Sequence, residues 1–426
     1  MTERKILDDC FVHDKERLRH DEALAILKAA VAPVVGTEKV SLEEASGRVL
    51  AEAVTSARAV PADDNSAVDG YAFAFADYQA TGGFFPVVER IAAGHPSRTP
   101  LPVGAAARIF TGAVMPGRAD TVAMQEDCER HDQDGEDFVV IPPELKAGTN
   151  CRPAGEDLAA GDAVAVAGRR LRPQDIAAIA STGQAEISVF RPIRVALFST
   201  GDEIVRPGAP LGQGQVYDSN HYLLRALLES VGAEISDLGI LSDEAQSVAD
   251  ALTGAAADHH AVLTTGGASR GEEDHLVTTL DALGKRHLWQ LAIKPGRPMT
   301  FGQIGKTIVL ALPGNPVAAF VCFLLYARPV LSVLAGAGWL EPPRFAIAAG
   351  FDIDKKKPDR REFLRGTLAR ENGQLEVRKF ARDGSGLITS LRQADGLIEL
   401  DEETTRVRRG DPVAFIPFSA LGLVTS

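Results

Sequence analysis

The sequence contains few cysteines, and these follow no spacing typical of a metal site or a disulfide framework. The four are scattered along the chain, at Cys10, Cys128, Cys151 and Cys322. Structural zinc sites and disulfide-rich domains both need cysteines in close, regular spacings such as C-x-x-C. The pattern therefore argues against both, and isolated cysteines give no reason to propose a cysteine nucleophile.

Positive charge is also scarce. The chain has 45 Lys and Arg against 58 Asp and Glu, a formal net charge of −13 at pH 7. A general nucleic-acid-binding surface needs an excess of basic residues, although a local basic pocket can form in an acidic protein. We therefore expect no nucleic-acid partner.

Long apolar segments are missing as well. The most apolar run, residues 317–327, is short for a bilayer span and is followed by Arg328 and Pro329. A buried helix explains this run better. The first residues contain no apolar signal core. The sequence thus predicts a cytoplasmic protein with no membrane contact.

The predicted elements divide the chain into four domains of a multidomain α/β plus β fold. Residues 1–60 with 158–190 form a discontinuous helical linker domain, because 21–31 and 173–182 have helical periodicity and helix-start signals. Residues 61–157 form an inserted β-rich domain, in which Gly and Pro separate short strand-like runs. These runs are 85–91, 107–111, 121–124 and 138–141.

The second half of the chain changes pattern after Pro192. In residues 191–335, strands at 193–199, 261–265 and 307–312 alternate with helices at 217–231 and 317–334. Such alternation predicts a doubly wound parallel sheet. Residues 336–426 contain short strand-like runs with regular turns, which predicts a small β-sandwich or barrel. Those runs are 345–348, 362–368, 375–377, 397–400 and 413–416.

Three predicted strands of the central domain end in polar, glycine-containing turns. These are Thr200-Gly-Asp-Glu203, the turn from Gly266-Gly267 to Asp274, and Pro313-Gly-Asn-Pro316. Each alone is compatible with an ordinary turn or helix cap. Because the carboxyl ends of parallel strands share one edge of a sheet, the three turns together predict a phosphate-type site at that edge. Asp274 could hold a divalent cation there.

Basic residues occur in two places where they could complete this site. Lys294 and Arg297 flank a Pro-Gly turn that restricts the backbone, which suits oxyanion capture, although a solvated loop is the simpler alternative. Arg365-Gly366 and Gly384-Ser385-Gly386 offer similar groups from the C-terminal domain. The lone histidines His221 and His275 have no metal-type spacing.

Five motifs in this order resemble the MoeA family of molybdopterin molybdenumtransferases, which is similar to the gephyrin E domain. They are Asp64-Asn-Ser-Ala-Val-Asp-Gly-Tyr71, Phe198-Ser-Thr-Gly-Asp-Glu203, Thr265-Gly-Gly-Ala-Ser-Arg-Gly-Glu-Glu-Asp274, Ile293-Lys-Pro-Gly-Arg-Pro298 and Leu312-Pro-Gly-Asn-Pro316. The resemblance covers nearly the whole chain. It implies four domains, with a molybdopterin-binding-like central domain, and an elongated homodimer whose site includes parts of the partner subunit.

The resemblance also implies the reaction and its ligands. The family inserts molybdenum from molybdate into adenylylated molybdopterin, releases AMP and needs a divalent cation, usually Mg²⁺. The expected partners are a second copy of the chain, the pterin nucleotide and molybdate, with transient contacts to the adenylyltransferase and to molybdoenzyme chaperones as further candidates. Two alternatives stay open: a molybdopterin adenylyltransferase, and a non-catalytic gephyrin-like scaffold.

By the same resemblance, four groups of residues carry the function. The catalytic positions are Asp69, Glu203, Asp243, Asp274 and Lys294, and the metal ligands are Glu203, Asp243 and Asp274. The pterin-nucleotide positions are Thr111, Asp157, Gly201, Asp202, Gly266, Gly267, Ser269, Pro313, Gly314, Asn315 and Pro316. The molybdate positions are Lys294, Arg297, Arg365 and Ser385.

Two positions depart from the pattern of many family members. Arg270 adds a charge in Gly267-Ala-Ser-Arg-Gly271, where a valine is common, and Gln290 stands where some members have a lysine. Whether Arg270 replaces that charge stays open at this point.

Overall fold

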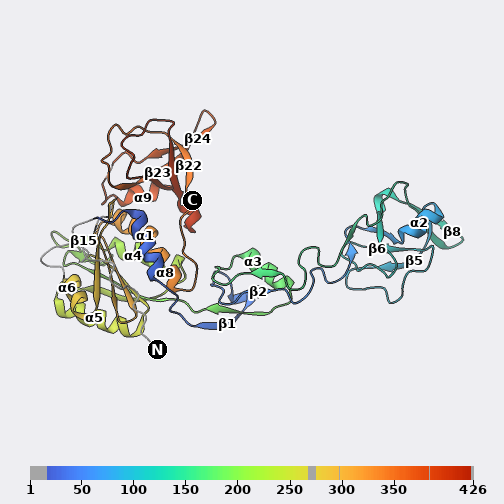
Figure 1. Cartoon of the computed structure of the whole chain (residues 1–426), viewed down its shortest axis with the longest axis horizontal. Coiled ribbons are helices and arrows are strands. Elements are labelled where there is room, and N and C mark those ends of the chain that lie inside the picture. Colours follow the sequence, from blue (N-terminus) through green and yellow to red (C-terminus); the bar gives the residue numbers. More distant parts are fainter. Residues whose placement is uncertain (1–16, 267–274, 297, 383, 424–426) are drawn as a thin grey trace.

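The computed structural model describes residues 17–266, 275–296, 298–382 and 384–423. Figure 1 shows an elongated molecule: the central α/β domain and the C-terminal barrel lie at one end, the β-rich inserted domain lies at the other, and the segment with α3 and β2 lies between them. This arrangement separates parts of the chain that the resemblance assigns to one site.

The central domain is built on a six-stranded sheet in the order β16-β13-β17-β21-β20-β18. The strands are β16 (Glu234–Leu241), β13 (Arg194–Thr200), β17 (Ala261–Thr265), β21 (Thr307–Leu312), β20 (Pro298–Ile304) and β18 (Lys285–Gln290). The first four are parallel, as predicted, but β20 is antiparallel to β21 and to β18. The sheet is therefore mixed, and the sequence analysis did not include this antiparallel edge.

Helices cover both faces of this sheet because its strands are apolar on both faces. Val195 and Leu197 pack in one core cluster, whereas the alternate residues Ala196 and Phe198 pack in another. The first face is covered by α1 (His20–Ala30), α4 (Ser219–Ser230), α7 (Pro316–Cys322), the π-helical turn η3 (Phe323–Ala327) and α8 (Arg328–Leu334). The second face is covered by α5 (Ala245–Asp258) and α6 (His275–Leu283).

The apolar helix predicted near residue 317 is a core helix. The continuous helical segment Pro316–Leu334 spans 19 residues, and 89% of its most apolar window is buried inside the molecule. The helix extends beyond the apolar run of residues 317–327, and in the described part of the chain it is the one segment long and apolar enough to cross a membrane. Its burial, however, supports the predicted core position.

The segment between the two ends combines one helix with two small sheets. The helix is α3 (Pro173–Ser181), which begins at Pro173 as predicted. The strand pairs are β1 (Thr37–Ser41) with β12 (Glu186–Phe190), and β2 (Val54–Thr55) with β11 (Ala163–Ala165); η1 (Leu42–Glu44) follows β1. The helix α3 was predicted in this region, but these strands were not. The other helix predicted for this domain, at 21–31, is α1, which packs on the central sheet instead.

The inserted domain contains a six-stranded sheet in the order β7-β4-β6-β5-β9-β8. Its elements are β4 (Gly70–Phe73), α2 (Phe75–Thr81), β5 (Phe84–Ile91), β6 (Ala106–Ile109), β7 (Thr121–Met124), η2 (Gln125–Asp127), β8 (Glu129–Gln133) and β9 (Glu136–Val140), with a separate pair β3 (Asn65–Ser66) and β10 (Cys151–Arg152). All four predicted strand-like runs are strands.

The C-terminal domain is a closed five-stranded barrel, as one of the two predicted alternatives. Its order is β23-β24-β22-β26-β25, and the pairing of β23 with β25 closes it. The elements are β22 (Phe345–Ala349), β23 (Arg361–Glu371), β24 (Gln374–Lys379), α9 (Ile388–Gln393), β25 (Gly396–Leu400), β26 (Pro412–Pro417) and η4 (Phe418–Leu421). β19 (Ile293–Lys294), from the central half of the chain, pairs in parallel with β23 and joins the barrel to the central domain.

Candidate functional site

The carboxyl ends of the parallel strands lie side by side in the central sheet. Thr200 of β13 is opposite Leu241 of β16, Ser199 is opposite Thr265 of β17, and Thr265 is opposite Leu312 of β21. The turns that follow these strands therefore start from one edge of the sheet. The two turns that the structure describes, at 200–203 and 313–316, and Gly266 at the start of the third, all lie there.

Two glycines at this edge are required by the backbone. Gly201 has φ +135°, and a Cβ there would lie 2.6 Å from Oε2 of Glu203. Gly266 has φ +87°, and a Cβ there would lie 2.7 Å from Oγ1 and 2.8 Å from the carbonyl oxygen of Thr200. A side chain at either position would be strained and would clash. The edge is thus shaped by close packing of backbone and polar groups.

The polar turns that follow β13 and β16 meet at the same edge. Oδ1 of Asp202 accepts a hydrogen bond from the backbone N–H of Asp243 at 3.4 Å, and Glu203 is exposed beside Gly201. Within the described ranges, no group of three or more His, Cys, Asp or Glu is arranged to hold a metal ion. The third predicted metal ligand, Asp274, lies outside the described residues, as do Gly267, Ser269 and Arg270.

The Pro313–Pro316 turn contacts two other elements. Nδ2 of Asn220, in the first turn of α4, donates to the carbonyl oxygen of Gly314 at 2.6 Å. The backbone N–H of Val317, in the first turn of α7, donates to the carbonyl oxygen of Ser385 at 3.1 Å. Gly314 and Asn315 themselves are exposed. The structure thus brings a loop of the C-terminal barrel onto the turn after β21.

Lys294 lies at the junction between the central domain and the barrel. It is paired with Glu362 across β19 and β23, and its Nζ lies 3.7 Å from Oε2 of that residue. The Glu362 side chain is 8% exposed and the Lys294 side chain 37% exposed, so a buried carboxylate orients a partly exposed ammonium. Arg297 lies outside the described residues, and the side chain of Gln290, at the end of β18, is not described.

Arg365 is buried beneath the loop that carries Ser385. It is 4% exposed; its Nε donates to Oγ of Ser390 at 2.9 Å, and its Nη2 donates to the carbonyl oxygens of Arg382 at 3.0 Å and Gly384 at 3.3 Å. The guanidinium thus holds the loop from below, a role that the sequence analysis did not predict.

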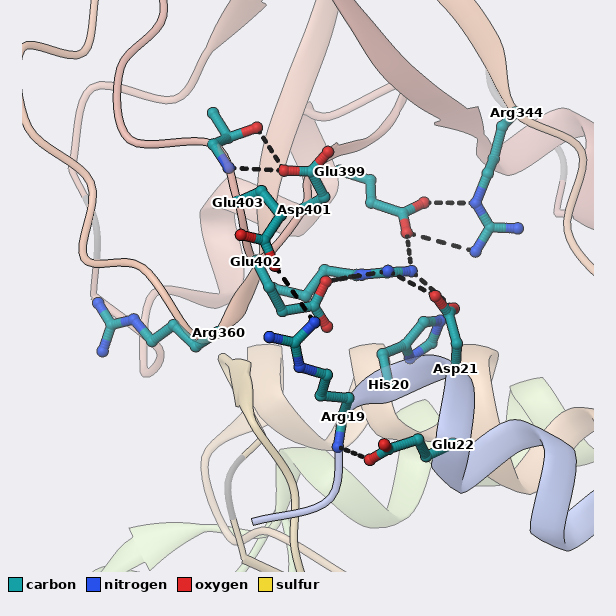
Figure 2. Close-up of polar contacts among 12 residues, drawn as sticks. Arg19, His20, Asp21, Glu22, Arg344, Arg360, Glu399, Asp401, Glu402 and Glu403 are labelled. Carbon is teal, nitrogen blue, oxygen red and sulfur yellow. Dashed lines mark hydrogen bonds and ion pairs between the residues drawn. The ribbon is translucent and has the colours of Figure 1, made fainter.

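The barrel is fixed to the central domain by a charged cluster around Arg361, part of which is drawn in Figure 2. Arg361 donates two hydrogen bonds to Asp21 at the start of α1, at 2.8 and 2.9 Å, and others to Glu399 and Glu402 of the barrel. Nδ1 of His20 lies 2.7 Å from the Tyr326 hydroxyl of η3. The ion pairs of Arg361 thus connect α1 of the central domain to the barrel.

The remaining predicted residues lie in or next to the inserted domain. Oδ1 of Asp69 accepts hydrogen bonds from the backbone N–H and the hydroxyl of Thr111, at 2.8 and 2.7 Å. These bonds hold the pKa of Asp69 below its usual value. Asp157 is exposed, and its N–H donates to the carbonyl oxygen of Val60. Within one chain, the domain with Asp69 and Thr111 is far from the central sheet (Figure 1).

Two residues at the edge were missed by the sequence analysis. Asn220 belongs to Asp218-Ser219-Asn220, which looks like a set of helix caps, and Asp218 is indeed the N-cap of α4. Glu362 looks like an ordinary strand residue. Their contacts with Gly314 and Lys294 join distant parts of the chain, so local patterns carry no signal for them.

Comparisons with known proteins agree with one another. Three family descriptions match the chain in order: MoeA N-terminal region (domain I and II) at residues 18–183, probable molybdopterin binding domain at 196–333, and MoeA C-terminal region (domain IV) at 349–418. The molybdopterin molybdenumtransferase of Haemophilus influenzae is 37% identical over 387 residues, which cover 90% of this chain and 95% of that protein.

Further relatives extend this similarity. The molybdopterin molybdenumtransferase of a Nostoc species is 36% identical, with 88% of each chain covered. Among solved structures, the molybdopterin biosynthesis MoeA protein of Pyrococcus horikoshii superposes with a TM-score of 0.80 at 29% identity, over 94% of this chain and 100% of that one.

Proposed function

Since the chain belongs to the MoeA family of molybdopterin molybdenumtransferases, we propose that it inserts molybdenum from molybdate into adenylylated molybdopterin and releases AMP. The supporting observation is that glycine turns from parallel strands start at one edge of the central sheet, where the Ser385 loop of the barrel contacts the first turn of α7. Lys294 lies at the junction of the same two domains. A phosphate-binding edge and an oxyanion-binding junction are the two halves that this reaction requires.

The turns at the strand ends bind the phosphates of the pterin nucleotide. Gly201 and Gly266 let the turns pack closely against Glu203 and Thr200, and the turn with Pro313, Gly314, Asn315 and Pro316 leads into α7. Backbone N–H groups at such turns and helix starts attract anions, and ligands of doubly wound sheets bind outside the carboxyl ends of the strands. Gly267 and Ser269 would extend this surface.

The carboxylates at this edge suit Mg²⁺. Proteins commonly hold Mg²⁺ with one or two carboxylates together with substrate phosphates, and not in a cage made by the protein alone. Exposed Glu203, and Asp243 beside Asp202, offer such a partial set, and Asp274 would add a third carboxylate. When bound, the ion would neutralise charge on the phosphoanhydride. The three carboxylates orient and bind; none is required as a nucleophile.

Molybdate binds where the barrel meets the central domain. Lys294 supplies a partly exposed ammonium oriented by Glu362, and the Ser385 loop lies next to Asn315 and α7. Charge-assisted hydrogen bonds from such groups suit a tetrahedral dianion. Arg297 would add a second cation, and Arg365 acts from beneath the loop. Any charge from Arg270 would also favour anions.

The catalytic centre uses groups of the partner subunit. Asp69 and Thr111 form a hydrogen-bonded pair on the inserted domain, and the N–H of Asp157 donates to Val60, which precedes this domain. In one chain the inserted domain is distant from the central sheet (Figure 1). An elongated homodimer in which the inserted domain reaches the partner's central edge would unite both groups. We expect a dimer in the cytoplasm, with transient contacts to the adenylyltransferase and molybdoenzyme chaperones.

None of the cysteines that the structure describes has a thiol activated as a nucleophile. Burial raises the pKa of Cys128 and of Cys151 to about 11, and burial also raises the pKa of Cys322, which is fully buried. Thiols with such pKa values stay protonated at neutral pH, and the thiolate is the nucleophile. Binding and orientation of the two substrates therefore carry the proposed reaction.

One assay separates this proposal from its alternatives. Purified protein is incubated with adenylylated molybdopterin, Mg²⁺ and with or without molybdate, while AMP and molybdenum cofactor are measured. Molybdate-dependent release of both supports the proposal. A parallel arm of the assay contains ATP and molybdopterin in place of adenylylated molybdopterin. Synthesis of adenylylated molybdopterin in that arm would indicate an adenylyltransferase, and absence of both reactions would indicate a scaffold. The relatives named molybdopterin molybdenumtransferase match this chain over most of their length, and this similarity favours the first outcome.

A further inference from the structure

Asn220 occupies the contact between α4 and the Pro313–Pro316 turn. The residue is 8% exposed, and its Nδ2 donates to the carbonyl oxygen of Gly314 at 2.6 Å. Its other polar atom, Oδ1, is buried and has no hydrogen-bond partner among the residues that the structure describes. The amide thus makes one short bond to the turn and leaves one acceptor unsatisfied.

This balance argues against a role in stability alone. The net gain from one hydrogen bond is modest, and burial of an acceptor without a partner costs as much or more. Gly314 is exposed, so water can replace Asn220 as the donor to its carbonyl. An apolar side chain of similar size would serve the fold at least as well. The amide therefore needs another explanation.

The geometry of the peptide group between Gly314 and Asn315 explains why an amide is present at position 220. A trans peptide is planar, and its C=O and N–H point in opposite directions. When Asn220 holds the carbonyl of Gly314, it also fixes the direction of the N–H of Asn315 in the same peptide. Asn315 is exposed, and its Oδ1 lies 3.9 Å from a Cβ position at Gly386 of the barrel loop. That N–H is thus held in a turn at the carboxyl edge of the central sheet, next to the barrel loop that carries Ser385.

We propose that Asn220 is a positioning residue that orients the Gly314–Asn315 peptide toward the phosphates of the pterin nucleotide. This inference rests on the proposed function and adds a residue to it. Asn220 acts through the turn and contacts no reacting atom. Loss of the Asn220 amide leaves the turn in place but lets the Gly314–Asn315 peptide rotate. Nucleotide binding is then weakened, whereas molybdate binding is not.

The test compares Asn220→Ala and Asn220→Asp with a matched control, Thr307→Val. Thr307 is also buried, begins the same strand β21 at its other end, and donates from Oγ1 to the carbonyl oxygens of Ala256 and His259. All three variants lose a buried side-chain donor to a backbone carbonyl. Steady-state insertion kinetics give KM for nucleotide and for molybdate separately, thermal unfolding gives stability, and calorimetry gives the affinity for AMP alone.

For Asn220→Ala we expect KM for the pterin nucleotide to rise about tenfold, the equivalent of one hydrogen bond, with KM for molybdate unchanged. Stability should fall no further than in Thr307→Val, whose kinetics stay at the wild-type level. The Asp variant, which keeps the shape but has no donor, should behave like Ala or worse. An unchanged nucleotide KM in a folded Asn220→Ala protein would overturn the proposal, and so would equal effects on both KM values. Failure of the wild-type protein to turn over would instead overturn the proposed function, and AMP affinity would still report on Asn220.

Discussion

Replacement of Arg365 by alanine should raise the molybdate requirement of the enzyme far more than its pterin-nucleotide requirement. Arg365 is 4% exposed and donates to Ser390, Arg382 and Gly384, directly before Ser385. Each hydrogen bond from a charged group contributes roughly 1.5–3 kcal/mol. If the loop loses the equivalent of one such bond in the molybdate complex, the molybdate KM rises about tenfold to a hundredfold.

The assay titrates molybdate at saturating nucleotide, and nucleotide at saturating molybdate, with AMP release as the readout. Because the alanine variant also loses buried packing, thermal unfolding must show that it is folded at the assay temperature. Arg365→Lys keeps the charge without the fork of donors, and Ser390→Ala removes one partner without changing Arg365. We expect both to raise the molybdate KM by less than Arg365→Ala does. An unchanged molybdate dependence, or a loss confined to the nucleotide, would refute this account of Arg365.

Three further predictions concern stability and assembly. Burial lowers the pKa of His20 to about 3, and Arg361 lowers it further by a smaller amount. As pH falls below about 6.5, His20 therefore takes up a proton in the unfolded chain but not in the folded one, and the free energy of unfolding should drop by about 2 kcal/mol from pH 7 to pH 5. Urea titrations of His20→Gln at the two pH values should lack this drop of about 2 kcal/mol. Arg361→Ala should lower the unfolding free energy by about 3–5 kcal/mol, because the buried carboxylate of Glu402 loses its ion pair and that of Glu399 keeps only Arg344. Arg130→Ala, at an exposed pair, should lower it far less. Equal effects of the two substitutions would contradict this assignment. Sedimentation at micromolar concentration should give the mass of a dimer, and a fully active monomer would argue against a shared site.

Local patterns in the sequence were enough for the three parallel strands whose turns form the edge of the central sheet. Apolar runs ending in glycine predict β13, β17 and β21, and the parallel alternation places their ends at one edge, as the register confirms. The start of α3 at Pro173 follows from local chemistry too. In each case the signal lies within a few residues of the element.

The contacts that complete the site could not be predicted in this way. Asn220 and Gly314 are 94 residues apart, and Arg361 and Asp21 are 340 residues apart. Arg365 looks like a free anion-binding side chain, but its burial depends on how the barrel closes over it. The antiparallel strands β18 and β20 have no feature in the sequence that separates them from loops. Such tertiary contacts follow from the whole fold and not from any one segment.

The most direct test of a site shared between two subunits is complementation between two inactive variants. Asp69→Ala removes the carboxylate of the inserted domain, and Lys294→Ala removes the ammonium at the central edge. Dissociated and reassembled as an equal mixture, half of the dimers should contain one of each, with one intact site. Molybdate-dependent AMP release should then recover to roughly a quarter of the wild-type rate, although each variant alone is nearly inactive. No recovery above the two variants alone, in a mixture shown to contain heterodimers, would contradict the proposed site.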